Sequence, residues 1–567
     1  MTGTSKHRSN KKETNRKKNF LFLASFFILL SFNTLLAQAP PKKIIVENSD
    51  FVDIQQEEIP GAIRYRGNVR ILHDGVRMTC NTAYLFQKEN YIKAFGDVKM
   101  NQGDTVFMDS RYAEYQGNIK FAFATGNVVM RDPKMTLTTD TINFDRRIQQ
   151  AYYTTYGTIK DQENTLRSKS GRYYLNEKKF QFLTAVTITN PKYVIKSNHL
   201  DYYSNSGHSY LFGPSTITSK ENFIYTEKGF YDTKKNFAHF VKNSYIKYDN
   251  RLIRGDSLYY DRNREFASAT NNVKITDSIN KGVVRGHYGE VYRNQDSLVM
   301  TKRAVAATLI EKDTLYVHGK KLMVTGKPEN RIVRAFNNVR FYKIDMSGKC
   351  DSLHSNQKNG LTQLIGRPVI WNGENQLTGK VIHLISNPET EKLDSLKVLT
   401  DAFIASKDTL GAGYNQVKGV NLYGKFRDNK LYEVDLVKNT EKLYYGYDKG
   451  QLVAIDKGIS SRIHLELEDN KITTVTSFTN PESESYPEKD LPENARKLRG
   501  FLWRGDEIIK TKDDIFPPEE NEIHEKILKQ SKIDKAKEDT PMEVRKETLD
   551  YDKKKPEKKL EKKAKTQ

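Results

Sequence analysis

A short phrase, in which a Gly, Asn or Asp pair precedes an alternating apolar stretch, recurs along the chain at nearly constant intervals. It reads "YRGNVRI" at residues 65–71, "AFGDVKM" at 94–100 and "ATGNVVM" at 124–130. A fixed period of 20–50 residues is typical of stacked arrays, in which each unit buries its apolar face on its neighbours. Weaker copies extend the pattern to eleven aligned positions, 27 to 34 residues apart: Val69, Val98, Val128, Ile159, Ile188, Ile217, Ile246, Val273, Val305, Val339 and Val369.

The phrase predicts a β-strand that has one buried face. Val98 and Met100 alternate with Asp97 and Lys99, and this period of two is that of a strand whose apolar side chains all point one way. Because Gly, Asn and Asp tolerate positive φ, the preceding pair predicts a tight turn or bulge where the chain enters the strand. The intervening "DPK", "NEKK", "SNSG" and "DRNRE" are turn sequences. We therefore expect an all-β solenoid of about eleven repeats of roughly 30 residues.

The two ends of the chain differ from this body. Residues 1–19 are basic, and the apolar run "FLFLASFFILLSFNTLLAQA" follows, which is the order of a secretory signal peptide over residues 1–39 with cleavage after Ala37 or Ala39. A retained membrane anchor is the alternative. We expect the repeat array at 58–400, further strands at 401–480, and a Lys/Glu-rich tail at 481–567 that is largely disordered or partly helical near "NEIHEKILKQSKI".

The net charge of +22 is not confined to the ends. Residues 1–19 hold seven basic residues and one acidic residue, and residues 481–567 hold 22 of each sign, so most of the positive charge lies on the body of the chain. A basic exported protein indicates an anionic partner, such as a phosphorylated glycolipid, a polysaccharide or a membrane surface, or else a solvated surface without a partner. The export signal disfavours nucleic acid. Cys80 and Cys350 predict two buried small side chains, although a single bridge between them stays open.

The paired half-repeats "AxGNVxM…LTxDxxxF/Y" resemble the OstA-like repeat, the family of the LptA-like periplasmic lipopolysaccharide-transport proteins. The second half-repeat supplies the aromatic residue, as at Tyr84, Phe144, Tyr202 and Tyr260. The resemblance implies a β-jelly-roll, stacked into an open, taco-like slot that shields the acyl chains of lipid A. It further implies a periplasmic bridge of a Gram-negative bacterium, associated with the outer membrane, that joins transport proteins at the inner and outer membranes.

The alternating stripe supplies the candidate residues for that lipid-binding slot. They are the apolar pairs of the best-conforming copies: Val69, Ile71, Val98, Met100, Val128, Met130, Val273, Ile275, Val339 and Phe341. We expect no catalytic residues, no metal and no cofactor. The recurring "DSL" and "DTL" aspartates follow the repeat register, which favours turn capping over carboxylate chemistry.

Two other functions remain compatible with the sequence: an exported β-helix enzyme that acts on polysaccharide, and a structural or adhesive β-solenoid with a filled core. A stacked array also ends in strand edges, which accept further strands. We therefore expect the first rung, around Val69, to associate edge to edge with a partner or with a second copy.

Overall fold

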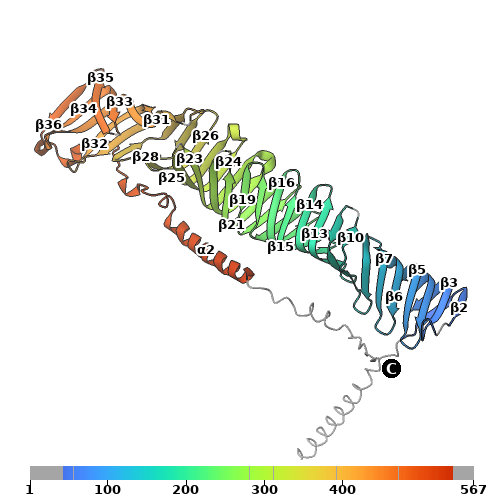
Figure 1. The fold of residues 1–567 in the computed structure, drawn as a ribbon. Helices are drawn as coiled ribbons and strands as arrows, with labels where there is room; N and C mark the ends of the chain where they lie inside the picture. The colour runs from blue at the N-terminus through green and yellow to red at the C-terminus, as the bar shows by residue number, and fades with distance from the viewer. Residues whose placement is uncertain are drawn as a thin grey trace, which may run out of the picture. The chain divides into compact units, whose positions relative to one another are not determined.

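The computed structural model describes residues 42–54, 57–161, 163–279, 281–310, 312–390, 392–469 and 471–539. The predicted signal peptide and the end of the predicted tail lie outside these residues. The chain divides into two compact units, Met1–Gln162 with Arg172–Asn176, and Glu163–Gly171 with Glu177–Gln567. Both consist of antiparallel strands that follow one another along the chain, which confirms the all-β prediction (Figure 1).

The first unit contains the strands β1 (Ile45–Asn48), β2 (Phe51–Asp53), β3 (Ile63–His73), β4 (Val76–Phe86), β5 (Tyr91–Gln102), β6 (Val106–Gln116), β7 (Phe121–Asp132), β8 (Met135–Asp145), β9 (Gln150–Tyr153) and β10 (Gly157–Lys160). Strand β12 (Ser170–Tyr174) begins in the second unit and ends in the first.

The second unit contains β11 (Thr165–Ser168), β13 (Lys179–Asn190), β14 (Tyr193–Tyr203), β15 (His208–Thr218), β16 (Asn222–Asp232), β17 (Phe237–Lys242), β18 (Tyr245–Tyr248), β19 (Arg251–Arg254), β20 (Ser257–Asp261), β21 (Phe266–Asp277), β22 (Gly282–Tyr292), β23 (Ser297–Ile310), β24 (Asp313–Thr325), β25 (Ile332–Lys343) and β26 (Met346–Asn356). It continues with β27 (Leu361–Ile365), β28 (Val369–Asn372), β29 (Asn375–Thr378), β30 (Val381–Ser386), β31 (Leu393–Lys407), β32 (Tyr414–Arg427), β33 (Lys430–Asp448), β34 (Gln451–Glu468), β35 (Lys471–Phe478), β36 (Glu482–Tyr486) and helix α2 (Pro518–Asp539).

The repeated phrase forms a bulge in the middle of a long strand, not a corner at its start. In β5, Gly96 and Asp97 have φ of 71° and 45° and together face Arg111 of β6, between the aligned pairs Phe95–Tyr112 and Val98–Ser110. An extra residue in one strand bends it. The bulge therefore divides each long strand into two halves. The first arm consists of the residues before the bulge of an odd-numbered strand, such as 91–95 of β5, and of the residues paired with them on the neighbouring strands. The second arm consists of the residues after the bulge, such as 98–102, and of their partners.

The bend brings opposite strand ends together. The turn at Asp74 lies at the second-arm end of β4, and Arg146 lies in a turn at the first-arm end of β8. An eleven-residue strand would hold such ends about 35 Å apart if it were straight. Instead, the Arg146 guanidinium donates to the Asp74 backbone oxygen at 3.1 Å. The arms thus face each other across an interior, and we call the line where their ends meet the mouth.

Two further predictions from the sequence need correction. The first rung is not an open edge, because β1 and β2 both pair with β3 and "ENSDFVD" covers it. The edge strands are β1 and β2, which carry the exposed apolar side chains Ile45, Phe51 and Val52. In addition, Val305 lies on the outer face of its strand. The residues on either side of it, Ala304 and Ala306, point to the interior, and side chains alternate along a strand.

Residues 488–539, expected as part of a charged tail, run along the outer face of the second unit; we call them the strap. The strap covers Val305 with Ile509, Ile515 and Phe516, and it covers Phe403, Leu443 and Ile455 with Leu491 and Leu498. Helix α2 lies against β21 and β23 and includes the helical stretch expected at 521–533 (Figure 1). The boundary at residue 481 remains a prediction. Within the described residues, no helix is long and apolar enough to cross a membrane.

Candidate functional site

The interior between the arms holds the predicted slot residues. All ten are buried, with at most 5% of their surface exposed: Val69, Ile71, Val98, Met100, Val128, Met130, Val273, Ile275, Val339 and Phe341. The intervening Asp97, Lys99 and Lys274 are exposed, which confirms the predicted alternation. Whether these side chains touch lipid is not decided by their burial and stays a prediction.

The interior is filled by the protein's own side chains. Near the bend, where the arms diverge least, the interior positions are alanines (Ala83, Ala94, Ala113 and Ala124), and none of the four is exposed. Toward the mouth the residues grow, as in Ile92 and Met100. Because protein interiors are close-packed, an acyl chain has room only if the arms move apart. The groups that hold the mouth shut therefore decide access to the interior.

Large aromatic side chains close the mouth from the first arm. They recur every 29 residues: Tyr115, Phe144 and Tyr173 in the first unit, and Tyr202, Tyr231 and Tyr260 in the second. All six are buried, with at most 7% exposed. In the strand register, Tyr231 and Tyr260 alternate with Ala238 and Ala267, so that large and small side chains interleave along the row. An aromatic ring with a hydroxyl suits this place because its body is apolar and its tip is polar.

The tyrosine hydroxyls bond to polar groups of the second arm. Tyr173 donates to the Asp132 carboxylate at 2.7 Å, and the Asn222 amide donates to Tyr260 at 2.7 Å. Tyr115 bonds to the His73 ring at 2.8 Å. Burial raises the pKa of Tyr260 to about 12 and lowers the pKa of His73, so both groups are neutral near pH 7. Each contact is a non-covalent latch between the arms.

Ion pairs reinforce these latches. Asp74 at a second-arm end pairs with Lys120 from a first-arm turn, and hydrogen bonds from Lys120 and Lys42 hold the pKa of Asp74 well below its ordinary value. In the second unit, Arg331 pairs with Asp277, and Arg262 lies 3.8 Å from Glu221. The Lys120–Asp74 pair is partly exposed and contributes little by itself. Arg331 and Asp277 are largely buried, so breaking their pair costs more.

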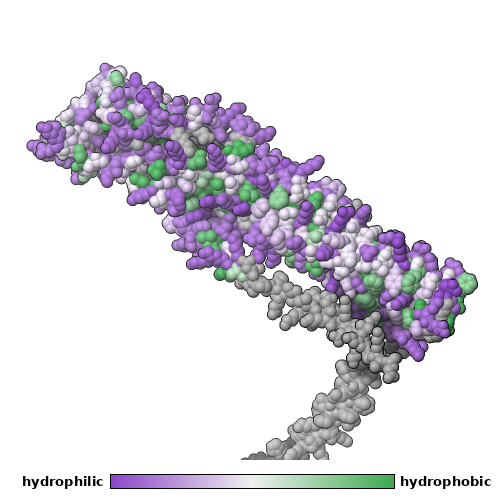
Figure 2. All heavy atoms as spheres, in the orientation of Figure 1, coloured by the Kyte–Doolittle hydropathy of each residue, from purple (hydrophilic) through white to green (hydrophobic). Residues whose placement is uncertain are grey.

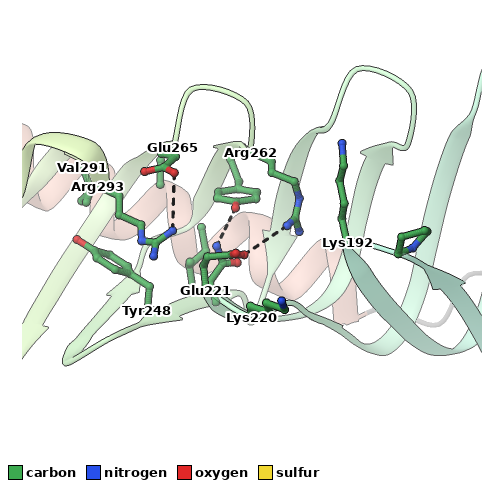
Figure 3. A pocket seen from close by; sticks show the side chains of 13 residues that line it. Lys192, Lys220, Glu221, Tyr248, Arg262, Glu265, Val291 and Arg293 are labelled. Atoms are coloured by element: carbon green, nitrogen blue, oxygen red, sulfur yellow. Dashed lines mark hydrogen bonds and ion pairs between the residues drawn. The ribbon is translucent and has the colours of Figure 1, made fainter.

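The row of tyrosines ends at β20, and a hollow of about 330 Å³ opens in the mouth there (Figure 3). In the register, Ala267 pairs with Val291, so valine takes the place that Tyr231 and Tyr260 occupy on the preceding rungs. Lysine and arginine side chains surround the entrance, and Ile246, Ala267 and Val291 line the apolar floor. The hollow is thus a break in the closing layer.

The described residues offer no comparable constellation for catalysis. Glu433, Asp435 and His464 place ligand atoms within 4.8 Å of one another, but Asp435 already pairs with Arg462 at 2.7 Å. Asp313 and Asp408, two of the repeated aspartates, accept backbone N–H groups of Thr314 and Leu410, which is the expected turn capping. The described part of the chain therefore gives these acids structural tasks. Cys80 and Cys350 are free and buried.

A comparison with known protein families finds a match in the N-terminal part of the chain. Residues 41–198 match the family described as OstA-like protein. This confirms the resemblance over that stretch, which we call the OstA-like region. A crystal structure of LptH from Pseudomonas aeruginosa, titled the LptA-homologous periplasmic component of the lipopolysaccharide transport device, matches at 14% identity over 25% of this chain and 95% of LptH, with a TM-score of 0.19. No curated protein matches the sequence.

The OstA-like region contains six of the ten predicted slot residues, and the same bulged strands continue beyond it. Asn271–Asn272 and Asn337–Asn338 have positive φ and interrupt the registers of β21 and β25 just before Val273 and Val339. Sequence reasoning identified the interior, and it singled out Phe144, Tyr202 and Tyr260 as aromatic repeat positions without assigning them to a mouth. The 29-residue spacing of the aromatic row was the available signal, whereas the polar partners on the second arm are too varied to show a pattern.

Proposed function

We propose that the protein is an exported periplasmic protein of lipopolysaccharide transport, which shields the acyl chains of lipid A between its arms on the way to the outer membrane. The observation that supports this most is the OstA-like region, whose interior residues are apolar and whose mouth is closed by non-covalent contacts: aromatic side chains, hydrogen bonds and ion pairs. Binding is passive, and the direction of transport comes from an energy source elsewhere.

The energetics of such a site are favourable. Burying a chain of about ten CH₂ groups contributes roughly 8 kcal/mol, since each contributes about 0.8 kcal/mol. A cross-mouth hydrogen bond contributes about 1 kcal/mol net. Several acyl chains therefore outweigh the few hydrogen bonds that must break at the mouth. The apolar contacts that the arms make with each other are replaced by apolar contacts with the acyl chains.

The partners proposed for this function are other lipopolysaccharide-transport proteins at the inner and outer membranes, joined through strand edges. Strands β1 and β2 form one such edge, with Ile45, Phe51 and Val52 exposed. An edge strand has unpaired backbone groups that accept another strand. Self-association through the same edge follows from the same chemistry.

The filled interior also suits the alternative of a structural solenoid, in which the arms never part. Equilibrium binding separates the two functions. Delipidated full-length protein is titrated with purified lipopolysaccharide and, as the matched control, with the same material after complete deacylation. A carrier binds the acylated form only. Equal binding of both forms, or of neither, would contradict the proposal.

A further inference from the structure

We propose that the hollow beside Arg262 binds the phosphate group of an acylated amphiphile while the acyl chain enters the interior through its floor. This inference deepens the proposed function and rests on it. The chemistry that the site recognises is a phosphate monoester above an apolar chain.

The entrance of the hollow is cationic. Lys192, Lys220, Arg262 and Arg293 surround it, against Glu221 and Glu265 (Figure 3). The two arginines hold their glutamates loosely, at 3.8 and 4.0 Å. Lys192 and Lys220 are exposed, and among the described residues neither has a carboxylate partner. Phosphate oxygens accept the hydrogen bonds that such lysines and arginines donate.

Arg262 is built into the site. Its side chain is only 12% exposed, and its guanidinium lies 5.1 Å from the ring centre of Tyr193 on the second arm. One terminal nitrogen, Nη2, is buried without a hydrogen-bond partner, and so is the Tyr193 hydroxyl. Leaving a buried donor unpaired is costly, and a charged one costs more. Arg262 lines the hollow and Tyr193 does not, so an anion beside the guanidinium would give the arginine a partner.

The apolar floor of the hollow distinguishes it from an ordinary surface site for an anion. Ile246, Ala267 and Val291 are at most 6% exposed and belong to the same apolar interior as Ile275. On the preceding rungs, Tyr231 and Tyr260 block that passage, whereas Val291 is too small to do so. On the face that Figure 2 shows, apolar side chains lie in small groups among hydrophilic ones. A headgroup held here would have its chain at the point where the aromatic row ends.

The test titrates full-length protein with three probes: a phosphorylated diacyl glucosamine, the same lipid without phosphate, and inorganic phosphate. The variants are Lys192→Gln/Arg293→Gln, which spares the buried Arg262, and the outer-face control Lys274→Gln. We expect the wild type to bind the phosphorylated lipid at least tenfold more tightly than the other lipid. The double variant should lose that preference, and Lys274→Gln should keep it.

The outcomes distinguish this site from the proposed function. If both lipids bind equally and the double variant changes neither affinity, the phosphate site is wrong and the carrier function stands. If inorganic phosphate alone binds, and the double variant abolishes it, the phosphate chemistry stands but its source is free phosphate and the carrier function is wrong. If no probe binds the wild type, both are wrong.

Discussion

Replacing Tyr173 by Phe should lower the free energy of unfolding of the closed protein and raise its affinity for lipid. The substitution removes one hydroxyl, and with it the 2.7 Å bond to Asp132 across the mouth of the first unit, while the buried ring stays in place. Hydrogen bonds to charged groups contribute about 1.5–3 kcal/mol net. Because Phe144 already occupies the equivalent position in the row, the fold accommodates the change.

The lower value, about 1.5 kcal/mol, corresponds to roughly a tenfold change in an equilibrium constant. If the bond must break before an acyl chain enters, the closed state no longer gains that energy, and lipid affinity rises by up to the same factor. Urea unfolding followed by circular dichroism measures the loss of stability, and titration with purified lipopolysaccharide measures the gain of affinity. The exposed Tyr156→Phe is the matched control. A variant that loses stability without gaining affinity would refute the idea that the mouth opens for lipid.

Four further predictions follow from the same structure. Asn127→Val should lower the free energy of unfolding by about 1–2 kcal/mol because a β-branched residue strains at φ 53°, whereas Thr184→Gly at φ 66° should raise it; equal effects in urea unfolding would contradict the bulge assignment. Truncation after residue 487 should keep the β circular dichroism but expose Phe403, Leu443 and Ile455, so that the dye ANS binds; unchanged ANS fluorescence would show that the strap covers nothing apolar. Burial lowers the pKa of His287 and His318 to about 4, so the unfolded chain takes up protons first as the pH falls below about 6.5, and stability should fall between pH 6.5 and 4; His318→Asn should flatten that slope. Ile45→Lys/Phe51→Lys should reduce self-association in sedimentation, and Ile344→Lys, exposed on a turn, should not.

Much of the fold was predictable because the strand signal is local. Val98 and Met100 alternate with exposed residues, and Gly96–Asp97 marks the bulge, so the sequence states both the buried face and the interruption. The bulges at Thr184–Ala185 and Lys302–Arg303 have positive φ without any residue that favours it. At these two bulges the neighbouring strands impose the positive φ, and the backbone strain costs free energy. The sequence of the bulge itself therefore gives no sign of it. The phrase likewise does not reveal that its bulge lies in mid-strand.

The mouth and the strap were harder to predict because their contacts are long-range. Tyr173 meets Asp132 over 41 residues, and Asn272 meets Ser531 over 259. The strap has a low density of apolar residues and therefore resembled a disordered tail. Five of its apolar side chains are nevertheless buried, among them Phe516, whose ring centre lies 3.5 Å from the Arg303 guanidinium. Such pairings follow from the stacking of the strands, which composition alone does not reveal.

Photo-crosslinking in cells tests the central claim, that lipid lies between the arms, most directly. A photoreactive phenylalanine analogue is placed at the interior positions Val98 and Ile275 and, as controls, at the adjacent outer-face positions Lys99 and Lys274. The captured molecule is then identified by mass. The account predicts that lipopolysaccharide is captured from Val98 and Ile275 and not from Lys99 or Lys274. Capture from the outer face alone, or no capture from the interior in a correctly folded variant, would contradict it.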